Sequence, residues 1–289
     1  MYRVIGIQRL VFAVPNVQEV GTFYRDIWGM EALFEGDTEW LLRCRDSHLS
    51  DFVLVRSEAK AELAELTFEA RNAEELTTLL SDAERAGGRV LRSPSVSPGR
   101  PAEWAAAIAD PDGNRIGIVT ASHGRAPLGT RSGQSGPHRI GHVVFWTPRI
   151  EAQEAFYAAL GLRVTDRTAM GMSFLRCNAD HHSLALVRSK GQIGVQHVAF
   201  DVGTLDAVMR ECGRLKAAGV ECVWGPGRHG PGGNVFAYYR DPAGIVIEFY
   251  GEMQKFSPDD DVVEPVFWGP EHRGDVWGLA GPAPEVFRP

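Results

Sequence analysis

Three side chains that can bind a metal ion or move a proton lie within one predicted hairpin near the C-terminal end: His229, Tyr238 and Glu248. Residues 234–239 are rich in strand-forming types, 241–244 form an Asp-Pro-Ala-Gly turn sequence, and an apolar run that contains Glu248 follows. A carboxylate inside an apolar strand is costly unless it is paired or bound to a metal ion. The hairpin therefore predicts that Glu248 is either paired with another side chain or bound to a metal ion.

Two histidines lie on other apolar segments that are predicted to be strands. His142 falls within 140–145 and His197 within 195–200. With Glu248 they provide two imidazoles and one carboxylate, the facial triad that binds Fe(II) and leaves open positions in non-haem oxygenases. A single histidine on an apolar strand is more often a packed core residue, so the prediction of a metal site rests on all three together.

The elements that must position these residues follow a repeated order of strand, helix and three strands. The first unit is predicted as a strand at 4–14, a helix at 17–28 capped by Asn16 and ended by Gly29, and strands near 31–34, 40–44 and 52–55. The second is predicted as a strand at 65–69, a helix at 73–86, and strands near 89–91, 104–109 and 115–119. A segment rich in Gly, Ser, Pro and Arg follows at 121–137, a composition typical of a linker.

After this segment the same order returns with matching residues. Val11-Phe12 corresponds to Val144-Phe145 at an offset of 145 − 12 = 133, and Asp110-Pro111 corresponds to Asp241-Pro242 at 241 − 110 = 131. Chance matches would not keep such a register, so the chain is predicted to contain a duplicated domain. The predicted boundaries are 1–120 for the N-terminal domain, 121–137 for the linker, 138–250 for the C-terminal domain and 251–289 for a tail.

The duplication gives each predicted ligand a counterpart in the first half. By the local offsets, the counterparts are Arg9 for His142 (142 − 133), Glu65 for His197 (197 − 132) and Gly117 for Glu248 (248 − 131). Arginine, glutamate and glycine do not make a metal site. Because both halves must form the same fold, the three ligand residues are predicted to serve chemistry in the C-terminal domain, and the N-terminal domain is predicted to lack a metal site.

The second half resembles the type I extradiol catechol dioxygenases of the vicinal oxygen chelate superfamily. The resemblance lies in a motif of His229, seven intervening residues, Ala237, Tyr238, the turn at 241–244 and then Glu248. Ala237 departs from the family, in which a larger apolar residue is usual. The segment 178–186 resembles the family's His-bearing strand, with His182 at the active-site position. The resemblance covers nearly the whole chain as architecture, and its specific motifs lie within 138–250.

The resemblance implies an α+β fold of four βαβββ modules paired into two tandem domains, as in glyoxalases and bleomycin resistance proteins. It implies that His142, His197 and Glu248 bind Fe(II), and Mn(II) suits the same ligand types. The implied reaction is an extradiol ring cleavage that inserts both atoms of O₂ into a catechol, either a substituted catechol or one like 2,3-dihydroxybiphenyl.

The resemblance also implies roles for three further side chains. His182 would be the acid/base that handles the catechol proton, and His229 and Tyr238 would hydrogen-bond the bound catecholate. Taken alone, His182 could be a surface residue and His229 could lie in an exposed loop. The neighbours His181 and Tyr239 are predicted to point away from the site.

The residues that would shape a substrate pocket are less specific. Val144, Trp146 and Phe174 lie close in sequence to the proposed site, and they either line a slot for the aromatic ring or belong to the core. The aromatic residues of the tail either cover the pocket mouth or pack on the other domain: Phe256, Phe267, Trp268 and Trp277. The sequence leaves both alternatives open.

Three other functions fit parts of this pattern. A hydroxyphenylpyruvate-type dioxygenase also uses two His and one Glu, but it would not need His182, His229 and Tyr238 together. A glyoxalase-type lyase usually draws a fourth ligand from the other module, where no convincing ligand is found. A metal-free binding protein of the same fold would have no reason to keep the triad.

Composition narrows the remaining classes. The net charge of −7 and the lack of a basic cluster argue against a nucleic-acid partner, and no apolar run is long enough to span a membrane. The 4 cysteines form no CxxC pair, which favours a reduced, cytoplasmic protein. Since members of the family are commonly oligomers, a homo-oligomer is expected.

Overall fold

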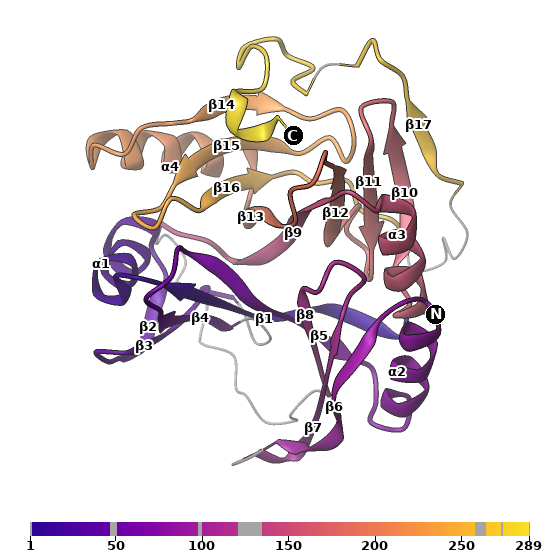
Figure 1. The fold of residues 1–289 in the computed structure, drawn as a ribbon. Coiled ribbons are helices and arrows are strands. Elements are labelled where there is room, and N and C mark those ends of the chain that lie inside the picture. Colours follow the sequence, from indigo (N-terminus) through magenta and orange to yellow (C-terminus); the bar gives the residue numbers. More distant parts are fainter. Residues whose placement is uncertain are drawn as a thin grey trace.

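The computed structural model describes residues 2–46, 51–97, 100–120, 135–257, 264–272 and 274–288. Most of the predicted linker, 121–134, lies outside these ranges. In the described part of the chain, two mixed β-sheets lie one above the other in the view of Figure 1, with helices at their flanks. None of the helices there has the length and apolar character that a membrane crossing requires.

The first sheet is formed by the N-terminal half. Its strands are β1 (Val4–Val14), β2 (Glu31–Glu35), β3 (Glu39–Arg43), β4 (Asp51–Arg56), β5 (Glu62–Ala70), β6 (Arg89–Ser97), β7 (Arg100–Ala109) and β8 (Arg115–Thr120). They are arranged in the order β2-β3-β4-β1-β5-β8-β7-β6. Each group of four strands is one module, and the antiparallel pair β1·β5 joins the two modules.

The second sheet repeats this arrangement and adds a strand from the tail. Its strands are β9 (Arg139–Thr147), β10 (Arg163–Thr168), β11 (Met172–Arg176), β12 (Leu184–Arg188), β13 (Gly194–Gly203), β14 (Trp224–Arg228), β15 (Val235–Arg240), β16 (Val246–Gly251) and β17 (Val266–Trp268). Their order is β14-β15-β16-β13-β9-β12-β11-β10-β17. The predicted fold of four βαβββ modules is therefore confirmed, and β17 is an edge strand that the sequence pattern did not indicate.

Each module carries one helical segment after its first strand. These segments are α1 (Val17–Thr22) with the π-helical turn η1 (Phe23–Trp28), α2 (Leu76–Arg85), α3 (Ile150–Ala159) and α4 (Leu205–Ala217), and a short 3₁₀ turn, η2 (Glu285–Phe287), lies in the tail. The predicted helix at 17–28 thus changes from α to π geometry midway. As predicted, Asn16 accepts from the backbone N–H of Glu19, and Gly29 follows the last turn with φ of 87°, a left-handed conformation that glycine adopts without strain.

Strand register confirms the residue correspondence between the two halves. In the first sheet Arg9 pairs with Thr67, and Thr67 pairs with Gly117. In the second sheet His142 pairs with Ala199, and Ala199 pairs with Glu248. The two rows occupy equivalent positions, so the offsets inferred from sequence align the same structural positions.

Aromatic side chains pack between the two halves, on the face of the second sheet that is opposite Glu248. Trp28, at the end of η1, stacks on Phe249 of β16, with ring centroids 3.6 Å apart and planes at 6°. Because side chains alternate along a strand, Phe249 faces the first half while its neighbour Glu248 faces the opposite side of the sheet. The packing of the two halves therefore supports the strand that carries the glutamate.

Candidate metal centre

Three buried side chains converge on one face of the second sheet. His142 lies on β9, His197 on β13 and Glu248 on β16, and one ligand atom of each lies within 4.8 Å of the others. Glu248 Oε2 is 3.2 Å from His142 Nε2 and 3.3 Å from His197 Nε2. His142 and Glu248 share a cross-strand row through Ala199, and His197 lies two residues before Ala199 on the same face. Strand pairing thus brings together residues that are 106 positions apart in sequence (248 − 142).

The chemistry of this set fits a divalent metal ion. Glu248 Oε2 and His197 Nε2 are buried and have no hydrogen-bond partner in the described structure. Burial alone would raise the pKa of Glu248, but the imidazoles of His142 and His197 outweigh it and hold this pKa well below its usual range. A buried anion beside bare imidazole nitrogens needs a cation, and two nitrogens with one oxygen are a donor set that Fe(II) and Mn(II) accept.

Neighbouring polar groups orient two of these side chains. The Nδ1–H of His197 donates to Gln196 Oε1 at 2.8 Å, which leaves the Nε2 lone pair directed toward the site. Asn234 Nδ2 donates to Glu248 Oε1 at 3.3 Å. The two interactions hold one imidazole and the carboxylate in the orientation that a metal ligand needs.

The predicted acid/base, His182, lies beside the centre. Its ring centroid is 4.3 Å from that of His142, and its side chain is buried. Burial lowers the pKa of His182 well below its ordinary value, and His142 lowers it further. His182 lies in the connection between β11 and β12 and not within a strand. The alternation of side chains along a strand therefore does not separate His181 from His182. His181 is buried as well, and its Nδ1 lies 3.1 Å from that of His182.

His229 and Tyr238 form a hydrogen-bonded pair on the other side of the centre. The Tyr238 hydroxyl donates to His229 Nε2 at 2.9 Å, and the Nδ1–H of His229 donates to the Gly274 carbonyl at 2.7 Å. Tyr238 pairs in register with Glu248 across β15 and β16, so it shares the face of the ligands. Burial raises the pKa of Tyr238 well above its usual value and so favours the protonated hydroxyl. Five of the six predicted ligand and catalytic side chains line one cavity: His142, His182, His197, His229 and Tyr238. The sixth, Glu248, lies beside this cavity, next to the two histidine ligands.

This cavity has a volume of about 600 Å³. Val144 and Phe174 line it, as do Met172 and Val187 from the same apolar cluster. Trp146 belongs to this cluster but is not among the lining residues, so a contact with substrate stays a prediction. Apolar walls that surround a few converging polar groups are typical of a small-molecule site.

The tail supplies one wall of the cavity. Trp268 and Phe287 line it, and the Phe287 ring packs edge-on against Tyr238 with centroids 4.8 Å apart. Asp275 fastens this segment, because its carboxylate accepts from the backbone N–H groups of Arg228, Trp277 and Ala280. Of the two alternatives for the tail, these contacts favour the pocket for Trp268, while Trp277 lies against the guanidinium of Arg228.

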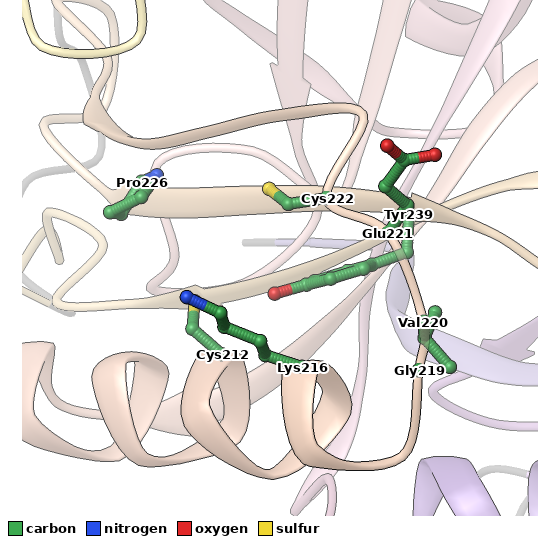
Figure 2. Close-up of a pocket in the computed structure, with 8 residues that line it drawn as sticks. All are labelled: Cys212, Lys216, Gly219, Val220, Glu221, Cys222, Pro226 and Tyr239. Atoms are coloured by element: carbon green, nitrogen blue, oxygen red, sulfur yellow. The ribbon is translucent and has the colours of Figure 1, made fainter.

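Tyr239 lies on the face of β15 opposite the site, in line with the prediction that it points away, but it is buried and not at the surface. It lines a second cavity of about 410 Å³ between α4 and strands β14 and β15, together with Cys212 and Cys222 (Figure 2). Burial raises the pKa of both thiols, and that of Tyr239 as well. This pocket is separated from the metal centre by the strand itself.

The equivalent place in the first sheet holds no ligand set. Glu65, the counterpart of His197, forms a 2.6 Å ion pair with Arg115. A Cβ at Gly117, the counterpart of Glu248, would lie 2.7 Å from Glu65 Oε1, so a side chain there would require Glu65 to move. Among the described residues, His142, His197 and Glu248 are the group with metal-binding geometry.

In comparisons with known proteins, both halves of the chain match the same superfamily. The model of the Glyoxalase/Bleomycin resistance protein/Dioxygenase superfamily matches residues 6–118 and again 139–249. Metapyrocatechase 2 of Cupriavidus necator is 32% identical over 194 residues, which cover 56% of this chain and 59% of that relative. The match to this relative thus spans less than two thirds of its length.

Solved structures share the whole fold. A Mn(II)-bound glyoxalase from Novosphingobium aromaticivorans is 27% identical with a TM-score of 0.88, and the alignment covers 99% of this chain and 94% of that one. Homoprotocatechuate 2,3-dioxygenase from Brevibacterium fuscum, in complex with 3,4-dihydroxyphenylacetate, is 20% identical with a TM-score of 0.86 over 99% of this chain and 92% of that one. The second likeness is one of fold.

Proposed function

This chain belongs to the glyoxalase/bleomycin resistance protein/dioxygenase superfamily, and from that premise we propose that it is an extradiol dioxygenase. The substrate would be a catechol whose ring is cleaved beside its two hydroxyls, with both atoms of O₂ inserted. The observation that supports this most is the placement of His182 on one side and the His229–Tyr238 pair on the other side of a two-histidine, one-glutamate centre.

We propose Fe(II) as the metal, held by His142, His197 and Glu248. When bound, such an ion provides open coordination positions, lowers the pKa of a hydroxyl that binds to it, and exchanges electrons with O₂. Mn(II) takes the same donor atoms, and the Mn(II)-bound glyoxalase shows that this fold accommodates it.

The remaining polar side chains have complementary tasks. The imidazole of His182 is placed to accept a proton from a catechol hydroxyl and to return it later in the reaction. The Tyr238 hydroxyl can turn from His229 Nε2 to donate to a negatively charged oxygen of the substrate, and His229 can accept from a remaining hydroxyl. The Gly274 carbonyl fixes the tautomer in which His229 Nε2 is an acceptor.

We propose a catechol with an apolar substituent, either an alkylated single ring or a biaryl. The wall formed by Val144, Met172 and Phe174 is apolar, and neither lysine nor arginine is among the described residues that line the cavity. A charged side arm on the substrate would lose its hydration there without gaining a partner. A ring with an apolar arm would bury surface against this wall.

We also propose that the two duplicated domains have different roles. In this view residues 1–120 form a domain without a metal site, 138–250 form the catalytic domain, and 251–289 form a tail that completes the pocket. Assembly into a homo-oligomer is part of the same proposal.

A glyoxalase-type reaction is the second candidate, because the Mn(II)-bound glyoxalase aligns over nearly the whole chain. It accounts for the three ligands but gives no task to His182, His229 and Tyr238 together. A metal-free binding protein would leave Glu248 buried without a cation.

The test is anaerobic purification with a metal assay, followed by O₂ uptake and visible spectra with catechol, 3-methylcatechol and 2,3-dihydroxybiphenyl. We expect about one O₂ per substrate and a yellow ring-opened product, with neither in His142→Ala. Bound metal without O₂ uptake, but with turnover of a hemithioacetal, would favour the glyoxalase reaction instead. A folded protein that binds no metal would overturn both.

A further inference from the structure

A buried histidine–aspartate pair lies directly behind His182 and, among the described residues, forms no hydrogen bond with the three metal ligands or with the His229–Tyr238 pair. His181 Nε2 is 3.1 Å from Asp166 Oδ2, and His181 Nδ1 is 3.1 Å from His182 Nδ1. The side chains of His181 and Asp166 are only 1% and 5% exposed. His182 lines the metal cavity, whereas the other two lie behind its wall.

Several contacts hold this pair in place. The indole Nε1–H of Trp268, on the tail strand β17, donates to the same Asp166 oxygen at 2.6 Å. The ring of Phe256 stacks on His181 with centroids 5.9 Å apart and planes at 24°, and Phe174 packs edge-on against both histidines. The pair is therefore packed and hydrogen-bonded on several sides, and two of its contacts come from the tail.

The hydrogen-bond inventory decides which nitrogen carries each proton. The carboxylate of Asp166 can only accept, so the proton between it and His181 lies on His181 Nε2. A neutral imidazole has one N–H, so His181 Nδ1 then carries a lone pair and accepts from the Nδ1–H of His182. This leaves His182 Nε2 without a proton, as the free nitrogen of a ring that lines the cavity.

We propose that His181 and Asp166 are positioning residues that fix His182 in its Nδ1–H tautomer, with the bare Nε2 directed to the metal pocket. This inference rests on the proposed function, in which His182 is the acid/base. With the opposite tautomer, His182 would present an N–H to the substrate and could not accept its proton. The role corresponds to that of an aspartate behind a catalytic histidine, with one more imidazole between them.

The same chain stabilises His182 after it has accepted a proton. A catechol O–H bond breaks, the proton moves to Nε2, and the oxygen keeps the electron pair. The resulting imidazolium still donates its Nδ1–H to His181, and the negative charge of Asp166 lies one ring farther away. The proton leaves again from Nε2, so no net proton passes along the chain.

The first arm of the test compares two substitutions of His181 in the metal-loaded enzyme. In His181→Gln the amide can accept from His182 and donate to Asp166, whereas in His181→Leu both bonds are lost. We expect the leucine variant to lose about 100-fold in kcat, the scale of general acid–base catalysis, with little change in KM or metal content, and the glutamine variant to recover most of that loss. His138→Leu removes a different histidine–aspartate pair, His138 Nδ1 to Asp46 at 2.6 Å, and should leave kcat unchanged.

The second arm reads the tautomer directly and does not depend on turnover. In protein loaded with diamagnetic Zn(II) and labelled with ¹⁵N-histidine, we expect His182 Nε2 to show the shift of an unprotonated nitrogen, and this signal to change in His181→Leu. A protonated Nε2 in the wild type, or full kcat in His181→Leu, would overturn the inference. If no catechol is consumed by the wild type, the proposed function fails, while the tautomer measurement still decides the role of the pair.

Discussion

The hydroxyl of Tyr24, in the first half of the chain, donates a 3.0 Å hydrogen bond to Oδ2 of Asp241, in the second. The duplicate of this contact runs the other way, from Tyr157 in the second half to Asp110 in the first, at 3.2 Å. Asp241 lies in the turn between β15 and β16, which carry Tyr238 and Glu248. The first half, which contributes none of the three ligands, therefore holds the hairpin that carries part of the site.

This reciprocity gives a matched pair of substitutions. Tyr24→Phe and Tyr157→Phe each remove one buried hydroxyl that donates to a buried carboxylate, so each should lower the free energy of unfolding by about 1–3 kcal/mol. Only Tyr24→Phe loosens the ligand hairpin, so only this variant should also bind metal more weakly. Urea unfolding and metal titration of both variants check this, and equal metal affinity in the two would contradict it.

Asp241 also predicts a pH dependence of stability. Burial raises the pKa of its carboxyl to about 6, although hydrogen bonds from the backbone of Ile245 and from Tyr24 act in the opposite direction. Because the folded pKa lies above the unfolded value, the native state favours the protonated form. The stability that this group contributes is therefore fully present at low pH, lost as pH rises from about 4 to about 6, and constant above that range.

The loss from this single group is about 3 kcal/mol or less, since one pKa unit corresponds to about 1.4 kcal/mol. Urea unfolding of the wild type and Asp241→Asn at a series of pH values isolates it, because the other titrating groups are common to both proteins. As the pH rises from about 4 to about 6, we expect the wild type to lose stability relative to Asp241→Asn. A difference that is flat with pH would refute the assignment.

Removing the metal ion should lower the stability of the protein, and this effect should require the three ligands His142, His197 and Glu248. A ligand that binds only the native state adds about 2.7 kcal/mol at a free concentration 100-fold above its Kd. We expect Fe(II), added anaerobically, or Mn(II) to raise the Tm of the metal-free wild type and of Glu65→Gln, but not of Glu248→Gln. Glu65 is the matched control, because it occupies the position of a ligand in the half that lacks the site. A metal-dependent rise in Glu248→Gln would place the ion elsewhere.

Sequence alone predicted the parts of this molecule that local pattern and internal duplication encode. The offset between the halves assigned Arg9, Glu65 and Gly117 as the counterparts of the ligands, and strand register gives the same assignment. Single positions inside apolar strands were informative because a histidine or glutamate there conflicts with its surroundings.

Contacts made by ordinary polar residues or by distant segments could not be predicted in the same way. Gln196 and Asn234 are uncharged, and nothing in their neighbourhood conflicts with a surface position. The Gly274 carbonyl that holds His229 belongs to a glycine 45 residues away, so no side chain signals it. His181 lies behind the cavity wall, but its contact with His182 could not be predicted, because residues 177–183 form a connection and not a strand with alternating faces.

Gln196 is expected to orient the metal ligand His197. Its side-chain oxygen accepts the Nδ1–H of His197 and so keeps the ligand nitrogen, Nε2, unprotonated and directed to the centre. Gln196→Leu removes the acceptor, and the imidazole is then free to rotate or to change tautomer. Groups that orient metal-bound histidines typically contribute about 10–100-fold to metal affinity. Gln196→Glu keeps an acceptor oxygen and should bind metal at least as tightly as the wild type.

Competition titration with a chelator of known affinity measures these differences without any substrate. Gln153→Leu on α3 is the control, since it removes another buried amide, on a helix that carries none of the ligands, and should leave affinity unchanged. If the two leucine variants lose affinity equally, the effect comes from general destabilisation. A loss confined to Gln196→Leu and absent from Gln196→Glu would show that orientation of His197 is what this residue supplies, because glutamate offers an acceptor to Nδ1 and leucine offers none.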